Sequence, residues 1–171
     1  PNSPTITNVA SSDPTNCGVA DGMINVTASG GSAPLQYSID SGATWAFNNG
    51  QFTGLAGDTY HVFVKNSDGS CLTTGTIEVL EDKVPAIIAS VVSADPSDCG
   101  VVDGTITITA ASPVGATLQY SIDGGASWQQ SEVYSGLAGG TYQIRVRNID
   151  GTCEVSDADV VITDKVLPII N

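Results

Sequence analysis

Short segments in which apolar and polar residues alternate dominate the chain. Met23–Thr27, Thr105–Thr109 and Tyr142–Arg147 alternate with a period of two, as strands with one buried face do. Pairs such as Asp21-Gly22 and Gly30-Gly31 separate these segments and are typical turn residues. No stretch offers three turns of helical periodicity with caps. The pattern therefore predicts an all-β chain of antiparallel strands.

The chain is also an internal duplication. DPTNCGVADGMINVTA at residues 13–28 returns as DPSDCGVVDGTITITA at 95–110, and LQYSIDSGATW at 35–45 returns as LQYSIDGGASW at 118–128. The spacing is 82 residues for the first pair and 83 for the second, which places a one-residue insertion near Pro113. Near-constant spacing is typical of repeat arrays. We predict two repeat domains, residues 1–84 and 85–171.

Each domain is expected to be a β-sandwich of about seven short strands. The motif GLAGDTY at 54–60, which returns as GLAGGTY at 136–142, predicts a tyrosine corner that leads into the penultimate strand. The fold class is therefore predicted to be two tandem immunoglobulin-like antiparallel β-sandwich domains. In the first domain the strands are expected at residues 5–9, 22–28, 35–40, 44–47, 51–54, 59–66 and 74–80.

Composition narrows the function classes. The 171 residues include 18 acidic and 5 basic side chains, for a net charge of −13. Binding to nucleic acid or to an anionic membrane needs clustered lysine and arginine, so we expect neither partner. No apolar run approaches the roughly 20 residues that span a bilayer, and the N-terminus lacks the pattern of a signal peptide. We expect the chain to be a segment of a longer protein.

Four cysteines recur at constant spacing: Cys17 and Cys71 are 54 residues apart, and so are Cys99 and Cys153. An even number in a repeated pattern predicts one disulfide within each domain, Cys17–Cys71 and Cys99–Cys153, and hence an extracellular or periplasmic location. Zinc is disfavoured because there is no Cys-x-x-Cys motif, and buried thiols are the alternative.

The number of strands expected between the two cysteines of a domain conflicts with a disulfide between them. Five strand passes separate the two cysteines of a domain and place them at opposite ends. The pairing holds if residues 10–21 run back along the sandwich, or if the 44–47 and 51–54 segments do not each make a full pass, and we expect one of these.

SIDSGATW at 38–45 and SIDGGASW at 121–128 fit the Asp-box pattern Ser-x-Asp-x-Gly-x-Thr/Ser-Trp. In such a hairpin the aspartate accepts backbone N–H groups, the glycine supplies an unusual backbone angle and the tryptophan packs beneath the turn. Sialidase propellers contain Asp-boxes, but the three substrate-binding arginines of those enzymes are absent, since the chain has only two arginines. We interpret the box as structural, with the residues Asp40, Gly42, Trp45, Asp123, Gly125 and Trp128.

Five aspartates recur in both copies, most of them beside proline or glycine, and turn formation accounts for them. Calcium is the alternative, because three oxygen-bearing side chains fall in one loop of each domain, although their spacing matches no EF-hand. The possible calcium ligands are Asp13, Asn16, Asp21, Asp95, Asp98 and Asp103. We expect no other cofactor.

Catalysis is not expected. The only histidine, His61, becomes Gln143 in the second copy, so no triad with histidine can repeat. The acids that recur are turn residues without the companion pattern of a glycosidase. The sequence thus predicts a protein that is not an enzyme.

The motif Cys-Gly-x-x-Asp-Gly-x-Ile (17–24 and 99–106), followed by Tyr-Ser, Gly-Leu-Ala-Gly-x-Thr-Tyr and Asp-Gly-x-Cys, resembles the SprB-type repeats of very large cell-surface adhesins of gliding Bacteroidetes. The resemblance extends over nearly the whole chain, twice. It implies a secreted, surface-exposed repeat protein that acts in attachment or motility.

We therefore predict a non-catalytic stalk or adhesion module. Its partners are expected to be neighbouring repeats of the same chain and an unknown surface or glycan target. One alternative is a carbohydrate-binding module that uses exposed aromatic residues such as Phe63 or Tyr134. Another is a pair of accessory domains beside a secreted enzyme.

Overall fold

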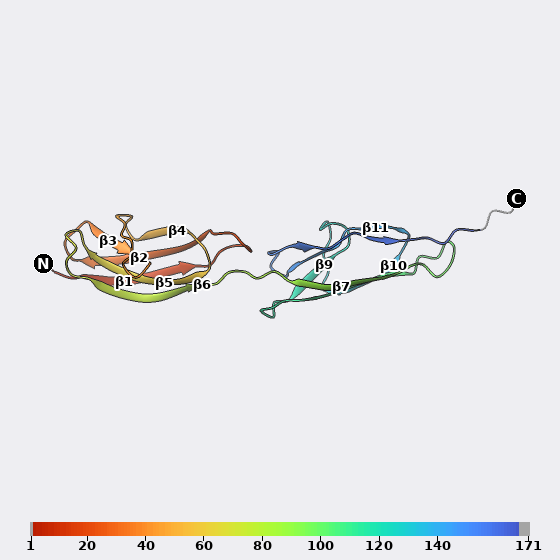
Figure 1. The fold of residues 1–171 in the computed structure, drawn as a ribbon, viewed down its shortest axis with the longest axis horizontal. Helices are drawn as coiled ribbons and strands as arrows, with labels where there is room; N and C mark the ends of the chain where they lie inside the picture. Colours follow the sequence, from red (N-terminus) through yellow and green to blue (C-terminus); the bar gives the residue numbers. More distant parts are fainter. Residues whose placement is uncertain (1, 168–171) are drawn as a thin grey trace. The chain divides into compact units, whose positions relative to one another are not determined.

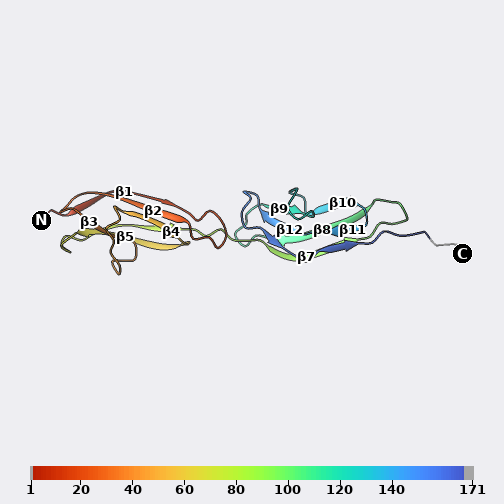
Figure 2. The same ribbon diagram turned by 90° about the horizontal axis from the view of Figure 1, so that it is seen from above.

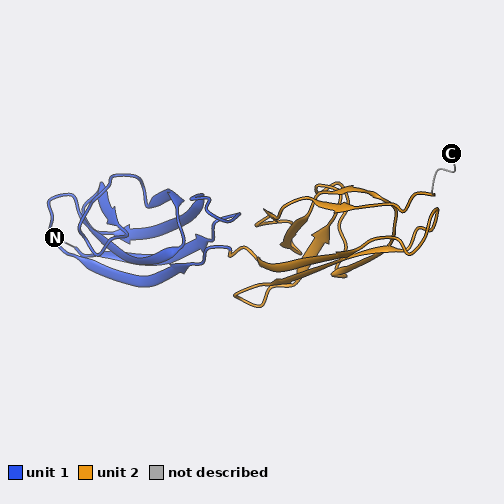
Figure 3. Cartoon of the chain, turned by 45° about the vertical axis from the view of Figure 1, so that its right-hand side comes forward, with its two compact units in different colours: residues 1–83 blue, residues 84–171 orange. Residues whose placement is uncertain are grey.

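A computed structural model describes residues 2–167 of the chain. The described residues form strands and no helix, so none of them offers a helical membrane span. The chain divides into two compact units, Pro1–Lys83 and Val84–Asn171 (Figure 3). The prediction of an all-β, antiparallel fold is confirmed.

Unit 1 is a sandwich of two three-stranded antiparallel sheets. One sheet has the order β1-β2-β4 and the other β3-β5-β6, and Figure 2 shows β1 and β2 on one side of the unit with β3 and β5 on the other. Lettered along the chain as A, B, C, E, F and G, these are the A-B-E and C-F-G sheets of an immunoglobulin domain without strand D. The strands are β1 (Pro4–Ser12), β2 (Gly22–Gly30), β3 (Leu35–Ser38), β4 (Gln51–Leu55), β5 (Asp58–Asn66) and β6 (Thr73–Leu80).

The alternation seen in the sequence sets the core of unit 1. Ile24 and Val26 of β2 and Val62 and Val64 of β5 are at most 1% exposed, whereas the residues between them reach the surface or its margin. Leu80 of β6 packs against them. Each such aliphatic side chain stabilises the fold by about 1.5–3 kcal/mol through removal of its surface from water.

The expected strand at 44–47 does not form. Only Ala46 pairs with a strand, through an isolated antiparallel bridge to Tyr37. Residues 39–50 instead make the Asp-box hairpin and return the chain across the unit, so that β4 runs in the same direction as β3. Each sandwich therefore has six strand positions rather than seven.

Unit 2 repeats this plan with two interruptions. The F position is divided into β11 and β12, and the G position into β13 and β14. Asp157 and Asp159 stand where unit 1 has Gly75 and Ile77, and the Asp157 carboxylate accepts its neighbour's N–H (from Ala158, 2.8 Å), a local bond that competes with the sheet ladder. The strands are β7 (Ile87–Ala94), β8 (Gly104–Ala111), β9 (Leu118–Ser121), β10 (Val133–Leu137), β11 (Gly140–Tyr142), β12 (Arg145–Asn148), β13 (Val155–Ser156) and β14 (Val160–Ile162).

Within unit 1 the first and last strands lie side by side and run in the same direction (Figure 1). At their beginnings the Thr73 hydroxyl donates to the Pro4 carbonyl at 2.7 Å, and towards their ends the Ser11 hydroxyl donates to Glu78 at 2.9 Å. The chain therefore enters unit 1 at one end, called here the N-terminal end, and leaves it at the opposite, C-terminal end.

Unit 2 has the same polarity. At its N-terminal end the Asn148 amide donates to the carbonyl of Val84 at 3.3 Å. At its C-terminal end the N–H of Thr163 donates to Asp95 at 2.9 Å, and the Lys165 ammonium donates to the Ser97 carbonyl at 3.0 Å.

Candidate functional site

The Asp-box residues form a hydrogen-bonded hairpin in both units. The Asp40 carboxylate accepts the N–H of Thr44 at 2.9 Å, the Thr44 hydroxyl at 2.5 Å and the Ser38 hydroxyl at 2.7 Å. Asp123 makes the same three contacts with Ser127 and Ser121, at 2.9, 2.5 and 2.7 Å. Because each aspartate is fully engaged within its own turn, it holds the hairpin and presents no carboxylate for general acid or base chemistry.

The hydrogen bonds of the box keep its aspartates ionised. Burial acts to raise the pKa of Asp40, but the bonds from Thr44 and Ser38 outweigh it and lower the pKa to about 2. The side-chain and backbone bonds from Ser127 lower the pKa of Asp123 to about 2 as well. Both carboxylates are surface groups, so solvent screens their contribution to stability.

The tryptophan of each box lies between a glycine and a cation. The ring of Trp45 lies under the Lys65 ammonium, with 3.8 Å between Nζ and the ring centroid. A Cβ atom on Gly42 would approach that ring to 3.1 Å, so the glycine leaves room for it. In unit 2 the Arg147 guanidinium carbon lies 4.0 Å from the centroid of Trp128. The box is thereby fastened to the neighbouring F strand by a cation–π contact.

All five recurrent aspartate pairs accept a backbone N–H. Three pairs do so within their own loop, as expected of turn residues, whereas Asp13 and Asp82 and their counterparts bond to segments far away in the sequence. Two of these bonds join the last residues of a unit to the turn before its F strand: the N–H of Gly57 donates to Asp82 at 2.8 Å, and that of Gly139 donates to Asp164 at 2.6 Å. The other pairs are Asp13 and Asp95, Asp21 and Asp103, Asp40 and Asp123, and Asp68 and Asp150.

The possible calcium ligands take part in the same bonding. Both carboxylate oxygens of Asp21 accept bonds from Thr15, which lower the pKa of Asp21, and Asp13 accepts the N–H of Glu81 at 2.9 Å. The side chain of Asn16 accepts the N–H of Cys17. Within residues 2–167 no group of three or more histidine, cysteine, aspartate or glutamate side chains is placed to hold a metal ion. Calcium binding therefore remains a prediction from the sequence.

The structure contradicts the disulfide predicted within the second domain. Cys99 is a half-buried thiol, whereas Cys17 and Cys153 are disulfide-bonded. The reason is position: Cys99 lies in the loop that holds Ser97 at the C-terminal end of unit 2, whereas Cys153 follows β12 at the N-terminal end. The length of a sandwich separates them.

Unit 1 has the same arrangement. The Cys17 sulfur lies 2.9 Å from the Lys83 carbonyl at the C-terminal end, and Cys71 is in the loop before β6 at the N-terminal end. A strand of nine residues spans about 30 Å, and a disulfide needs Cα atoms within about 7 Å. Residues 44–47 form no strand, but residues 39–50 still cross the unit, so the cysteines stay at opposite ends. The other expected route is wrong, because residues 10–21 do not run back along the sandwich.

The tyrosine corner forms in both units. The Tyr60 hydroxyl donates to the Ala56 carbonyl at 3.0 Å, and Tyr142 donates to Ala138 at 2.8 Å. Burial, and then the charges of Asp58 and Asp82, raise the pKa of Tyr60. This contact is the immunoglobulin hallmark that the GLAG-x-Thr-Tyr motif predicts.

A buried asparagine that the sequence analysis missed fixes the N-terminal end of each unit. Asn66 is fully buried; its amide donates to Asn2 and to Ser70, and its carbonyl accepts the N–H of Ser32 at 2.8 Å. In unit 2 the side-chain amide of Asn148 donates to the Val84 carbonyl, as that of Asn66 does to Asn2. Its recurrence in both copies at the start of Asn-x-Asp-Gly was the available signal.

The aromatic residues suggested for glycan binding do not form an open platform. Phe63 is half-buried, and Tyr134 packs against the core of unit 2 with a hydroxyl that is buried and has no hydrogen-bond partner within the described residues. Burial raises the pKa of Tyr134 to about 12. Its equivalent in unit 1 is Phe52, which packs against that core without a hydroxyl.

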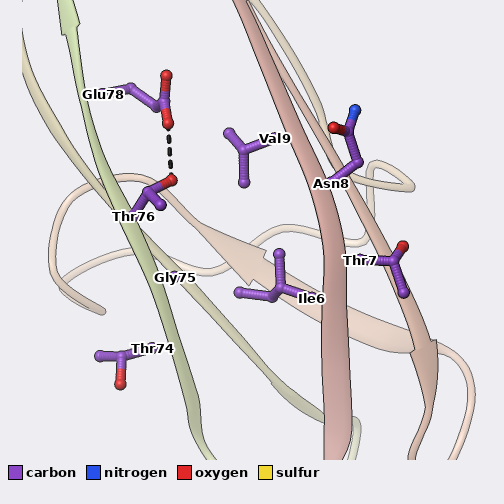
Figure 4. Close-up of a pocket in the computed structure, with 8 residues that line it drawn as sticks. All are labelled: Ile6, Thr7, Asn8, Val9, Thr74, Gly75, Thr76 and Glu78. Carbon is purple, nitrogen blue, oxygen red and sulfur yellow. Dashed lines mark hydrogen bonds between the residues drawn. The ribbon is translucent and has the colours of Figure 1, made fainter.

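Unit 1 has instead a groove of about 420 Å³ along the edge where β1 and β6 meet (Figure 4). Ile6 and Val9 point into it, and Gly75 leaves it open on the β6 side. The Glu78 carboxylate accepts the Thr76 hydroxyl at 2.7 Å and the Ser11 hydroxyl at 2.9 Å. Its lining residues are Ile6, Thr7, Asn8, Val9, Thr74, Gly75, Thr76 and Glu78.

These features define the chain as an immunoglobulin-like β-sandwich repeat whose recurrent polar residues bond within their own unit. The model of the SprB repeat family matches residues 8–44, which confirms the resemblance predicted from the sequence over that segment. No curated protein matches the chain. Among solved structures, the amphioxus IgVJ-C2 molecule matches with a TM-score of 0.35 and 18% identity, over 94% of this chain and 96% of that one.

Proposed function

We propose that the chain is a non-catalytic repeat segment of an extracellular bacterial adhesin, and that it acts as a spacer in surface attachment or gliding. The observation that carries the proposal is the polarity of each unit. The chain enters a unit at one end and leaves it at the other, so that every added repeat lengthens the path between the domains on its two sides.

Other features support this proposal. The SprB match indicates a repeat module of a cell-surface protein, and each unit has a hydrophobic core of its own. The disulfide state of Cys17 and Cys153 is compatible with an oxidising, extracellular location. A net charge of −13 keeps neighbouring molecules soluble and mutually repelled.

The proposal is tested by changing the number of repeats in the parent protein in its native host. Removal or addition of whole 82-residue repeats should leave surface display intact, shift a distal epitope towards or away from the cell, and change attachment or gliding in step. A matched control replaces one repeat by its neighbour and keeps the number constant. Attachment that is indifferent to repeat number would contradict the spacer role, and a catalytic domain beside the repeats would favour the accessory role.

Glycan binding is a second candidate, and the groove of unit 1 favours it. Its apolar floor lies beside hydroxyl, amide and carboxylate groups, a combination that suits a sugar ring. The polar lining is specific to unit 1, because Ala158 and Val160 stand where unit 1 has Thr76 and Glu78. Saturable binding on a glycan array that the T76A variant loses would support this candidate, with an exposed threonine outside the groove, changed in T59A, as the control.

A further inference from the structure

The loop that carries Cys99 is a copy of the loop that carries Cys17. In the first, the N–H and hydroxyl of Ser97 donate to Asp103 at 2.8 and 2.6 Å; in the second, the same groups of Thr15 donate to Asp21 at 2.8 and 2.5 Å. The N–H of each cysteine is held by the side chain before it, at 2.7 and 2.8 Å. The two cysteines therefore occupy one structural position, at the C-terminal end of their units.

The chemical states of the two cysteines differ. Cys17 is disulfide-bonded and Cys99 is a thiol. Cys99 is half-buried between the exposed residues Asp98 and Gly100, so an oxidant and a partner thiol can reach its sulfur. Nearby, Val101 and Val102 are 39% and 57% exposed, which leaves apolar surface uncovered around the cysteine.

The cysteines of the opposite end also share one position. Cys71 and Cys153 both follow the F strand in the motif Asp-Gly-x-Cys, and both adopt a left-handed backbone, with φ of 56° and 59°. Cys153 is disulfide-bonded. One cysteine at a C-terminal end, Cys17, and one at an N-terminal end, Cys153, are therefore disulfide-bonded. The length of a unit prevents two cysteines of the same unit from pairing.

We propose that Cys99 is a cross-linking site for the Asp-Gly-x-Cys cysteine of another repeat that comes after unit 2. Two thiols lose two protons and two electrons to form the Sγ–Sγ bond, and a low-molecular-weight or protein disulfide accepts the electrons and becomes two thiols. This inference rests on the array within the proposed function and adds covalent closure of its junctions.

The test uses a longer chain, in which residues 1–166 are joined to residues 3–171 so that the repeat spacing is kept. The chain is oxidised in a glutathione redox buffer and digested without reduction. The expected product is a peptide pair that joins Cys99 of the first copy to Cys71 of the second, with Cys99 protected from a maleimide reagent. C99S should abolish the pair, and so should C71S in the second copy.

The matched control is C71S in the first copy, which leaves the cross-link in place. A Cys99 that stays reactive, that carries only glutathione, or that bonds to Cys99 of another molecule would overturn the proposal. These outcomes are independent of the spacer test, since surface display and attachment are measured separately from peptide linkage.

Discussion

The Nζ atom of Lys65 lies 3.8 Å from the ring centroid of Trp45, and Arg147 takes the same place over Trp128. The cation on the F strand changes between the copies, but its contact with the Asp-box tryptophan does not. The hairpin that leaves the C strand is thereby fixed to the neighbouring F strand of the same sheet.

Removal of this cation should weaken unit 1. Lys65→Met keeps the length and apolar stem of the side chain but removes its charge, so we expect a loss of about 0.5–1 kcal/mol in unfolding free energy. Denaturation followed by tryptophan fluorescence in a W128F background reports on Trp45 alone. Lys65→Arg is the control and should retain the stability; equal stability of the Met variant would show that the contact contributes nothing.

Acid should destabilise both hairpins within a defined pH range. Asp40 and Asp123 have folded-state pKa values of about 2, below the unfolded value near 3.8. Their contribution is therefore complete above about pH 4 and is lost as the pH falls towards 2. Calorimetry should show a falling Tm over this range, with a shallower fall in a D40N/D123N double variant. A parallel fall in both proteins would refute the assignment.

Two tyrosine-to-phenylalanine changes should have opposite effects. Tyr60→Phe removes the corner bond to Ala56 and should cost about 1 kcal/mol. Tyr134→Phe removes a buried hydroxyl that lacks a partner within residues 2–167 and recreates the Phe52 arrangement of unit 1, so we expect a gain of about 1 kcal/mol. Urea denaturation of the two variants measures both; a loss of stability in Y134F would indicate an ordered water at that hydroxyl.

Gly50 and Gly69 share a positive φ but differ in their surroundings. A Cβ atom on Gly50 would come 2.0 Å from the Val26 carbonyl oxygen, whereas one on Gly69 would meet nothing within 4 Å. Gly50→Ala should therefore cost more than about 3 kcal/mol, and Gly69→Ala about 1 kcal/mol. Similar losses in thermal unfolding would mean that backbone conformation alone governs both sites.

Calcium is checked most directly by thermal unfolding in calcium chloride and in EDTA. Because Asp21 and Asp103 each use both carboxylate oxygens on their own loop, we expect the same Tm in both solutions. A higher Tm with calcium, abolished in D21N, would establish the site that the sequence suggests.

Alternation at Ile24, Val26, Val62 and Val64 was enough to predict strands, a core face and the sandwich, because burial of every second residue is a local property of a strand. The tyrosine corner was also predictable, since its bond spans only four residues. These features depend on short stretches of chain that both copies preserve.

The cysteine pairing was not predictable from spacing. A separation of 54 residues is the same whether two cysteines meet or lie at opposite ends of a sandwich, and only the direction of the intervening strands decides which. The segment at 44–47 failed for a related reason: its apolar run Trp45–Phe47 is compatible with a short strand, but the bonds of Asp40 to Thr44 bend the chain into a hairpin. Long-range geometry overrode a local pattern in both cases.

The parallel course of β1 and β6 has a mechanical consequence. A pull applied through the two termini of a unit loads these strands in opposite directions along their length, so the ladders of β1 with β2 and of β5 with β6 are sheared as a whole instead of being unzipped bond by bond. Rupture then requires many hydrogen bonds to break together, which is the geometry in which a β-sandwich resists force best.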